Sequence, residues 1–432
     1  MKIAFVSQGH GKIDPPVVAG SISVWTFEII NALKESHAII AYEMDGGSYR
    51  GRRKYHENVA YYYAPTLYNR VGNRLYTLGR KALKSFPGYE SLPEKPYFLS
   101  VFYNLGYILW VAWHLRKQRC DLVHVHQYSQ YLPVIRFFNP RLKTVLHMHS
   151  EWASQLDRQI IGKRITRADL VIGCSDYISQ KIRDVFPASG EKVRTVYNGV
   201  HHERFKPEAE KPLADREDGP HLLFVGRVSP EKGIHVLIRA VRKLARHYPS
   251  IRLNIVGAIG SAPREFLVDL SDDLQVRGLA EFYPRVGQNG LFYYNILKSL
   301  CADGLESHVD FTGGVPYGQV VEHYRNADIL VNPSLSESFG MSLAEAMAAE
   351  KPVVATRVGG MVNVVDDERT GILVLPGDEN ALADAIARLI DSPSLRRRMG
   401  KEGRERILRL FSWEQVARNL EEEYRQMLAT SS

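Results

Sequence analysis

The feature that most constrains the fold of this chain is a repeated alternation of short, β-rich apolar runs with longer helical patterns. In the first half the apolar runs occupy residues 3–6, 38–42, 122–125, 144–148, 170–173 and 193–196, and a helical pattern lies near 24–33. Continuous apolar strands separated by helices are typical of a parallel sheet with helices on both faces. The first half is therefore predicted to be a doubly wound, Rossmann-like α/β domain.

A second series of the same kind follows a polar, proline-interrupted stretch at 207–220. Its strands are expected at 222–225, 253–256, 309–311, 329–331 and 353–355, with helices over about 234–248, from 341, and in two carboxy-terminal segments. A chain of 432 residues suits two such domains. We predict an amino-terminal domain over 1–205, a second domain over 206–411, a linker at 207–220, and a final helix over 412–432 that crosses back to the first domain. Binding crevices are expected at the carboxyl ends of both sheets, facing each other across a cleft.

Charge and cysteine content narrow the function classes. Residues 1–205 carry 28 Lys and Arg against 16 Asp and Glu, whereas the remainder carries 28 against 32. The basic first half is compatible with an anionic acceptor, with peripheral membrane contact, or with solvated helix faces only. No recognised nucleic-acid module accompanies the charge, so no nucleic-acid partner is expected. Cys120, Cys174 and Cys301 are widely separated, which favours free thiols. The first residues lack the pattern of a signal peptide, and we expect a cytoplasmic location, with the inner membrane face as an open alternative.

Two segments of the first half have uncertain roles. The apolar stretch at 97–113 is short for a membrane span and is predicted to be a buried helix leading into the strand at Asp121. Upstream, residues 50–84 interleave Arg and Lys with tyrosines, which indicates either a loop that contacts acceptor or membrane, or a plain polar loop.

The most specific motif lies at residues 333–348. A loop of small residues that contains Glu337 leads into a helix that carries Glu345 eight positions later. The amino end of such a helix presents unpaired N–H groups and suits a phosphate. Glu345 could accept hydrogen bonds from ribose hydroxyls, and Glu337 could reach sugar hydroxyls. The alternative is an ordinary amphipathic helix with solvated glutamates.

A second motif, at residues 226–233, follows a strand and precedes a helix. Arg227 and Lys232 flank a tight turn, so both cations can converge on one diphosphate and stabilise it as a leaving group. Surface cations on a βα turn are the simpler alternative.

The two motifs, in this order and spacing, resemble the retaining glycosyltransferases of family 4, which have the GT-B fold. Further matches occur at 168–175, 196–200, 352–356, 359–360, 370–374 and 411–414. The resemblance covers nearly the whole chain and is strongest from Asn198 to Ile390. It implies a nucleotide-sugar donor, retention at the anomeric carbon, and an acceptor bound by the amino-terminal domain.

Carried onto this sequence, the resemblance implies roles for individual residues. Arg227 and Lys232 would bind the donor diphosphate, Glu345 the ribose, and Glu337 the transferred sugar, while Ser338 and the backbone amides of Phe339, Gly340, Met341 and Ser342 would hold sugar hydroxyls and phosphate. The family also has a histidine after the strand that ends near 148. Strand alternation places His147 and His149 on one face, and we choose His149 as catalytic. His126 and His147 are acceptor-side candidates, together with His124, although packing at a strand end is the simpler explanation for His124 and His126.

The chain departs from the family pattern in three places. Ala19-Gly20-Ser21 replaces the usual paired glycines, which leaves Gly20 as the donor-binding candidate of the first loop. His201 stands where an aspartate is more usual. The stretch at 258–308 is longer than the family norm. It is a lid, a contact surface or, as we favour, an inert insertion.

Cofactor and substrate expectations follow from the same residues. The sequence contains no Asp-x-Asp pair, and we find no His/Cys cluster with metal-ligand spacing, so neither a metal nor another cofactor is expected. We predict a metal-independent hexosyltransferase that uses UDP-glucose or UDP-N-acetylglucosamine. The alternatives are a GDP-mannose-dependent mannosyltransferase and a non-catalytic nucleotide-sugar-binding protein. The acceptor, whether small molecule, glycan or lipid-linked, is not identified.

Overall fold

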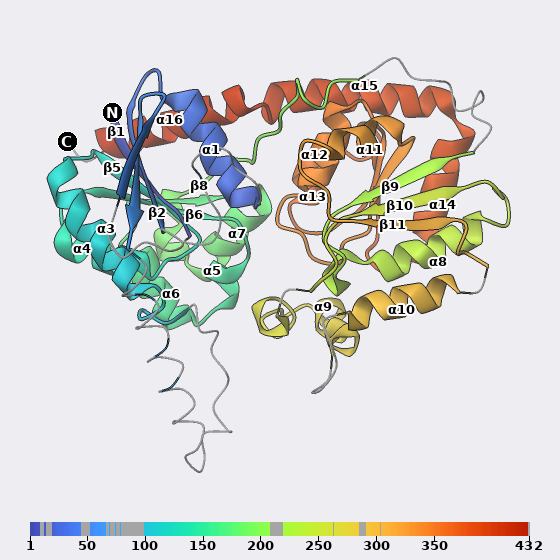
Figure 1. Ribbon diagram of the computed structural model, residues 1–432, viewed down its shortest axis with the longest axis horizontal. Helices are drawn as coiled ribbons and strands as arrows, with labels where there is room; N and C mark the ends of the chain where they lie inside the picture. The colour runs from blue at the N-terminus through green and yellow to red at the C-terminus, as the bar shows by residue number, and fades with distance from the viewer. Residues whose placement is uncertain are drawn as a thin grey trace, which may run out of the picture. The chain divides into compact units, whose positions relative to one another are not determined.

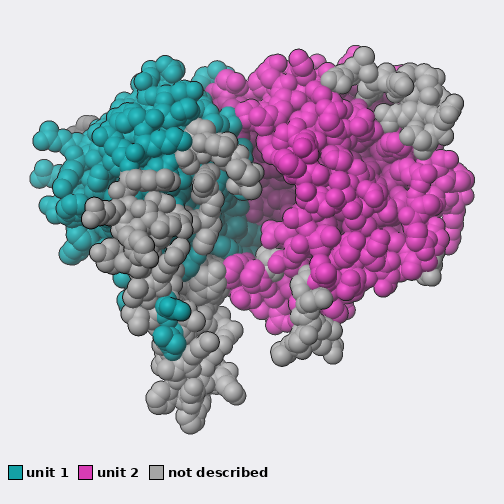
Figure 2. Space-filling model, viewed as in Figure 1, with its two compact units in different colours: residues 1–174, 178–196, 417–432 teal, residues 175–177, 197–416 magenta. Residues whose placement is uncertain are grey.

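The computed structural model describes residues 1–8, 13, 20–44, 52–65, 69, 74, 78, 99–207, 219–261, 263–284, 291–302 and 304–430. Most of the basic stretch at 50–84 and of the predicted linker lies outside these residues. The chain forms two compact units, coloured separately in Figure 2. Unit 1 comprises residues 1–174, 178–196 and 417–432, and unit 2 comprises residues 175–177 and 197–416.

Unit 1 is built on one eight-stranded sheet (Figure 1). Its order is β3-β4-β2-β1-β5-β6-β7-β8, and all neighbours are parallel except β3 and β4. The strands are β1 (Lys2–Val6), β2 (Ala38–Met44), β3 (Arg52–His56), β4 (Val59–Ala64), β5 (Leu122–His126), β6 (Lys143–Met148), β7 (Leu170–Gly173) and β8 (Val193–Thr195). The central strands are buried along their length because helices cover both faces. This confirms the α/β prediction for the first half.

The helices of unit 1 divide between the two sheet faces. Trp25 of α1 stacks on His124 of β5, whereas Tyr42 points from the opposite face of β2 and hydrogen-bonds to His114 of α3 at 2.9 Å. The helices are α1 (Ser21–Leu33), α3 (Leu105–Gln118), α4 (Tyr131–Phe138), α5 (Trp152–Gln155), α6 (Arg158–Ile165), α7 (Asp176–Val185) and the carboxyl-terminal part of α16 (Trp413–Ala429).

Two predictions for unit 1 need correction. Residues 52–64 form the antiparallel hairpin β3–β4, and β4 pairs with β2, so this part of the basic stretch extends the sheet and is not a loop. The helix expected at 97–113 begins at Leu105, and its Leu109 and Trp113 side chains are exposed, so it is only partly buried. Tyr97 and Phe98 lie outside the described residues. None of the helices that the structure describes is long and apolar enough to cross a bilayer.

Unit 2 repeats the doubly wound plan with a six-stranded parallel sheet of order β11-β10-β9-β12-β13-β14. The strands are β9 (His221–Val225), β10 (Arg252–Val256), β11 (Val309–Gly313), β12 (Ile329–Asn332), β13 (Val353–Thr356) and β14 (Ile372–Val374). The longer helices are α8 (Ile234–Leu244), α10 (Phe292–Cys301), α11 (Val320–Asn326), α12 (Met341–Ala348), α14 (Glu379–Asp391) and α15 (Pro393–Leu410). The strand order reverses beside β9, which places a crevice at the carboxyl end of that strand.

The end of the chain contains three helices where two were expected. Ser392 ends α14 and caps the next helix, because its Oγ accepts a hydrogen bond from the Leu395 N–H. Pro393 then occupies the first helical position, where its missing N–H costs nothing. Residues 379–410 therefore form two helices and not one continuous helix.

The extended segment at 258–308 contributes to the core of unit 2. Tyr293, Leu297 and Cys301 of α10 are buried in the main core with α8, and the Tyr293 hydroxyl bonds to Nδ1 of His235 at 2.9 Å. A smaller cluster joins Val268, Val276, Leu279 and Tyr283 to Leu335. The described part of this segment thus packs into the core of unit 2, and the expectation that the insertion is functionally inert stays a prediction.

Candidate active site

The turn at residues 226–233, called here the cation turn, is held against the loop at 333–340, called here the donor loop. Gly233 adopts a left-handed φ of +66°, and a Cβ at this position would lie 2.1 Å from the carbonyl oxygen of Pro333. The N–H of Leu335 also donates to the carbonyl of Glu231 at 2.8 Å. Only glycine allows this approach, which brings together two motifs that are about a hundred residues apart in the sequence.

Lys232 and Glu337 form an ion pair across this contact. Nζ of Lys232 lies 2.7 Å from Oε2 of Glu337, and each side chain is less than one-fifth exposed. Burial lowers the pKa of Lys232, but the carboxylates of Glu337 and Glu231 outweigh it and leave this pKa raised. Burial likewise raises the pKa of Glu337, but Lys232 outweighs it and leaves this pKa lowered. Both groups are therefore charged at neutral pH, and each is the other's partner.

The amino end of α12 follows the donor loop directly. Oε1 of Glu337 accepts the N–H of Ser338 at 3.1 Å, and Nδ2 of Asn332 donates to Oγ of Ser342 at 3.3 Å. Within the described part of the chain, the N–H groups of Gly340, Met341 and Ser342 form no hydrogen bond. First-turn amides lack partners inside their own helix, so this end of α12 can receive an anion.

Glu345 lies one turn into α12 and is buried. The hydroxyl of Tyr324 donates to its Oε2 at 2.6 Å, and that of Tyr317 donates to its Oε1 at 3.1 Å. Burial raises the pKa of Glu345 to about 7, although both tyrosine hydrogen bonds act in the opposite direction. Glu345 is thus a carboxyl group poised between its neutral and charged forms.

Arg227 differs from Lys232 in its exposure. Its side chain is exposed and follows the carboxyl end of β9. It still acts on the pair electrostatically, because its charge contributes a lowering effect to the pKa of Lys232. Arg227 is the accessible cation of this turn, and Lys232 is the buried one.

The histidine candidates of unit 1 form a compact cluster of four rings, called here the histidine cluster: His124, His126, His147 and His149. Nε2 of His124 lies 3.2 Å from Nδ1 of His147, and Nδ1 of His126 lies 3.0 Å from Nε2 of His149. His147 and His149 stack with ring centroids 4.0 Å apart, which confirms that they share one face. Trp25 of α1 contacts all four rings.

The histidine cluster carries no charge, although each of its four rings is an ionisable group. Burial lowers the pKa values of His124, His126 and His147 well below the usual range, and it lowers the pKa of His149 to about 3. All four rings are therefore neutral at neutral pH. His149 is the half-buried member, whereas the other three are fully buried.

The cluster corrects our statement that no histidine group has metal-ligand spacing. One ring nitrogen of each of His124, His126 and His147 lies within 4.8 Å of those of the other two. The reason is the sheet register, which pairs His126 with His147 on adjacent parallel strands. However, both ring nitrogens of His124 and of His126 already have hydrogen-bond partners, so the geometry favours a hydrogen-bonded cluster.

Gly20, the remaining candidate, begins α1. It has a φ of +99° and precedes Ser21, the first helical residue. Residues 14–19 of the loop before it lie outside the described residues. The structure thus places the predicted residues in two groups, with Gly20 and the histidines in unit 1 and all the others in unit 2.

Comparison with known proteins decides the family. Residues 49–204 match the model for Glycosyltransferase Family 4, and residues 205–406 match that for Glycosyl transferases group 1. The chain is 32% identical over 337 residues to D-inositol 3-phosphate glycosyltransferase 2 of Catenulispora acidiphila. This match covers 77% of the chain and 69% of that protein. The chain belongs to the family 4 glycosyltransferases.

Other relatives of this family 4 glycosyltransferase agree. It is 32% identical over 284 residues to D-inositol 3-phosphate glycosyltransferase of Saccharomonospora viridis, a match that spans 63% of the chain but only 59% of the relative. Sucrose-phosphate synthase of Thermosynechococcus elongatus superimposes over 99% of both chains with a TM-score of 0.73 and 25% identity. The GT-B assignment is confirmed, because that fold consists of two Rossmann-like domains.

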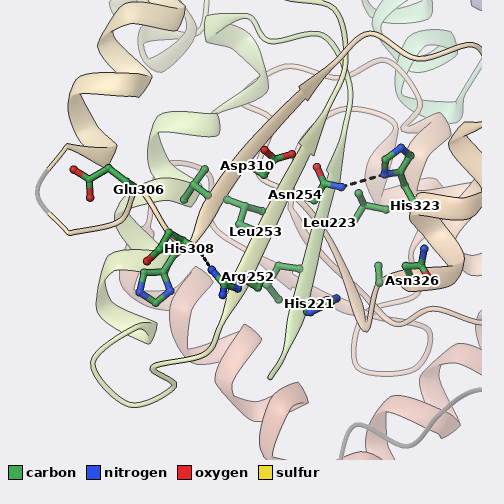
Figure 3. Close-up of a pocket in the computed structure, with 14 residues that line it drawn as sticks. His221, Leu223, Arg252, Leu253, Asn254, Glu306, His308, Asp310, His323 and Asn326 are labelled. Carbon is green, nitrogen blue, oxygen red and sulfur yellow. Dashed lines mark hydrogen bonds between the residues drawn. The ribbon is translucent and has the colours of Figure 1, made fainter. Parts of the chain in front are cut away.

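A cavity of about 440 Å³ in unit 2 lies away from the residues that the family resemblance singles out. Figure 3 shows its lining by His221, Arg252, Asn254, His308 and His323, where Nδ2 of Asn254 bonds to Nδ1 of His323 at 3.0 Å. His221, Arg252 and His308 stand at or just before the amino ends of β9, β10 and β11, and His323 is on α11, whereas Arg227 follows the carboxyl end of β9. In a family 4 glycosyltransferase the donor is expected at the carboxyl ends, so this cavity is not the donor site.

Sequence reasoning missed the residues that support the candidates. Tyr317 and Tyr324 hold Glu345 from positions 28 and 21 residues earlier, and Thr26 bonds to His126 across a separation of 100. Tyr424 of α16 bonds to Nδ1 of His124 at 2.6 Å. No spacing in the sequence indicates these pairs, because each depends on how distant strands and helices pack.

Proposed function

We propose that this family 4 glycosyltransferase is a retaining, metal-independent enzyme that transfers a hexose from a nucleotide diphosphate sugar to an acceptor hydroxyl. UDP-glucose and UDP-N-acetylglucosamine are the proposed donors. The observation that carries the proposal is the donor loop, where Lys232, Glu337 and the open amides of α12 meet.

The donor would be bound by exchange of existing contacts. A diphosphate can accept hydrogen bonds from the amides of Gly340, Met341 and Ser342 and can recruit the exposed Arg227 as a second cation. Lys232 would move from an exclusive pair with Glu337 to a shared contact with phosphate. Glu337 is then available to accept hydrogen bonds from the sugar hydroxyls, and Glu345 is available to the ribose.

The proposed reaction needs cationic stabilisation of one leaving group. The bond between the anomeric carbon and the diphosphate oxygen breaks, and the diphosphate keeps the electron pair. The acceptor oxygen bonds to the same face of the anomeric carbon, and its proton passes to the departing phosphate. Lys232, Arg227 and the helix amides would neutralise the charge that develops on the diphosphate. These residues would fill the role that a divalent cation has in other transferases.

The test is slow donor hydrolysis without an acceptor. Purified protein in EDTA is incubated with UDP-, GDP- and ADP-sugars, and release of nucleoside diphosphate is measured for wild type, Arg227→Ala and Lys243→Ala. Lys243 of α8 is the matched control, because it pairs with Glu379 of α14 at 2.8 Å and is not part of the cation turn.

Release from a UDP-sugar that is lost in Arg227→Ala and kept in Lys243→Ala would support the proposal. Release from GDP-mannose alone would replace the proposed donor. Binding of a nucleotide with no release, even with a panel of acceptor sugars, would favour a non-catalytic role.

A further inference from the structure

A chain of three side chains in unit 1 ends at His149. Oγ1 of Thr26 lies 3.0 Å from Nε2 of His126, and Nδ1 of His126 lies 3.0 Å from Nε2 of His149. Thr26 and His126 are completely buried, and His149 is half-buried. The three residues come from α1, β5 and the end of β6, so their alignment is a property of the fold and not of a local motif.

The donor-to-acceptor direction of these hydrogen bonds is fixed at Thr26. The Thr26 hydroxyl donates its single proton to the carbonyl oxygen of Ile22 at 2.7 Å, one turn earlier in α1. Toward His126 it can therefore only accept, and Nε2 of His126 must carry a proton. A neutral imidazole has one N–H, so Nδ1 of His126 is an acceptor. That acceptor faces Nε2 of His149, which must in turn be the protonated nitrogen.

The last step sets the chemistry of the exposed end. With its proton on Nε2, His149 has a lone pair on Nδ1, and no described residue forms a hydrogen bond with that nitrogen. The backbone N–H of His149 donates to Oε1 of Gln127 at 2.8 Å, which fixes the position of the residue. A ring held in this way accepts a hydrogen bond from a hydroxyl and cannot donate one through Nδ1.

We propose that Thr26 and His126 are positioning residues that hold His149 in its Nε2–H tautomer, so that Nδ1 accepts a hydrogen bond from a sugar hydroxyl during transfer. The proposal rests on the proposed function in one respect, namely that His149 meets substrate. The tautomer itself is a property of the free protein. His124 and His147 form a separate pair with Tyr424 and do not enter this chain of hydrogen bonds.

Removing one hydroxyl should reverse the chain. In Thr26→Val, Nε2 of His126 loses its acceptor inside the core, and a buried N–H without a partner is unfavourable. The proton then moves to Nδ1 of His126, which donates to Nε2 of His149, and Nδ1 of His149 becomes the N–H. Thr26→Ser is the matched control, because it keeps the hydroxyl. Thr26→Ala is a second variant without the hydroxyl, for use if valine prevents folding.

The first measurement is ¹⁵N NMR of histidine-labelled protein in EDTA, without donor or acceptor, with the His149 signals assigned from a His149→Ala variant. Wild type and Thr26→Ser should show the Nε2–H tautomer at His149, and Thr26→Val should show the Nδ1–H tautomer. An unchanged tautomer in Thr26→Val overturns the proposal. Wild-type ring signals that change on addition of Zn²⁺ after removal of EDTA also overturn it, because a metal ion would then organise the cluster.

The second measurement is donor turnover. We expect kcat to fall at least about tenfold in Thr26→Val, with a smaller change in KM for the donor and full rescue in Thr26→Ser, because a wrong tautomer removes a contact needed in the transition state. A reversed tautomer with undiminished kcat overturns the positioning role. Failure of the proposed function is distinguishable, because it abolishes wild-type turnover and leaves the NMR result unchanged.

Discussion

The donor loop and the histidine cluster differ in the charge state of their ionisable side chains. In unit 2, Lys232 and Glu337 are both largely buried and both charged, and each is stabilised by the other. In unit 1, four histidines cluster together and all are neutral, because burial lowers their pKa values. A buried ion pair can be exchanged for an anionic ligand, whereas a neutral cluster can only orient hydrogen bonds. The first arrangement suits a diphosphate and the second suits a hydroxyl.

The largest effect should come from removing the cation of the buried pair. Lys232→Ala leaves Glu337 as an unpaired buried carboxylate and removes a charge from the leaving group. We expect turnover to fall about a hundred- to a thousandfold. Steady-state assays with the donor found in the panel measure this, and Lys243→Ala should retain activity. Equal losses in the two variants would mean that the pair has no special role.

The next largest effect should be a loss of folding stability at acid pH that the histidine cluster causes. The folded rings stay neutral, with His149 titrating only near pH 3, whereas unfolded imidazoles take up protons below about pH 6.5. The unfolded chain then binds more protons, so stability is lost as pH falls below 6.5, by about 1.4 kcal/mol per pH unit for His149 and in the same direction for the other three rings. Urea midpoints between pH 7.5 and 5 measure this. His147→Asn should flatten the slope, because it removes one of the four buried rings.

A pH dependence of opposite sign should arise at Glu345. Its folded pKa of about 7 lies above the ordinary value of 4.5, so the folded state binds the extra proton between these values. Stability conferred by this group is present below pH 4.5 and is lost as pH rises to 7, by about 3 kcal/mol at most. Nucleotide affinity should rise as the pH passes through about 7, because Glu345 of the folded protein loses its proton there and a charged carboxylate accepts ribose hydroxyls better. Calorimetric titration of UDP into wild type and Glu345→Gln checks this. A variant that keeps the wild-type pH profile contradicts it.

The smallest effect should come from one tyrosine hydroxyl. The hydrogen bond from Tyr317 lowers the pKa of Glu345, so Tyr317→Phe should raise that pKa. The pH midpoint of nucleotide binding should then move upward by less than one unit. Tyr248→Phe is the control, because it removes a hydroxyl bonded to Asp391 on α14. A shift in the control variant would show that the change is not specific to Glu345.

Strands with continuous apolar sequences were predicted well, because strands of a parallel sheet are buried on both faces and their sequences are therefore apolar throughout. β5, β6 and β9 appear within one or two residues of the expected bounds. The hairpin β3–β4 was missed because β3 reads Arg52-Arg53-Lys54-Tyr55-His56, and its charged residues gave no alternating apolar pattern. Charged residues are frequent on such edge strands, since they discourage pairing with other chains.

The candidate site shows a different limit of sequence analysis. Alternation along β6 predicted that His147 and His149 share a face, but the partners on β5 follow from strand order and register. Similarly, the motifs of unit 2 were found separately, and the Lys232–Glu337 pair depends on Gly233 passing close to Pro333. Local sequence patterns identify the residues of a site, whereas the contacts between these residues depend on tertiary packing.

The discontinuity of unit 1 has a practical consequence for protein engineering. Residues 417–432 belong to unit 1 although more than two hundred residues of unit 2 precede them, and Tyr424 from this segment bonds to His124. A single cut cannot separate the two units into intact pieces. Expression of residues 1–196 alone would omit Tyr424, the hydrogen-bond partner of His124. A circular permutant in which residues 417–432 precede residue 1 would restore this contact. Split-protein reconstitution of this chain should therefore begin from a permuted sequence.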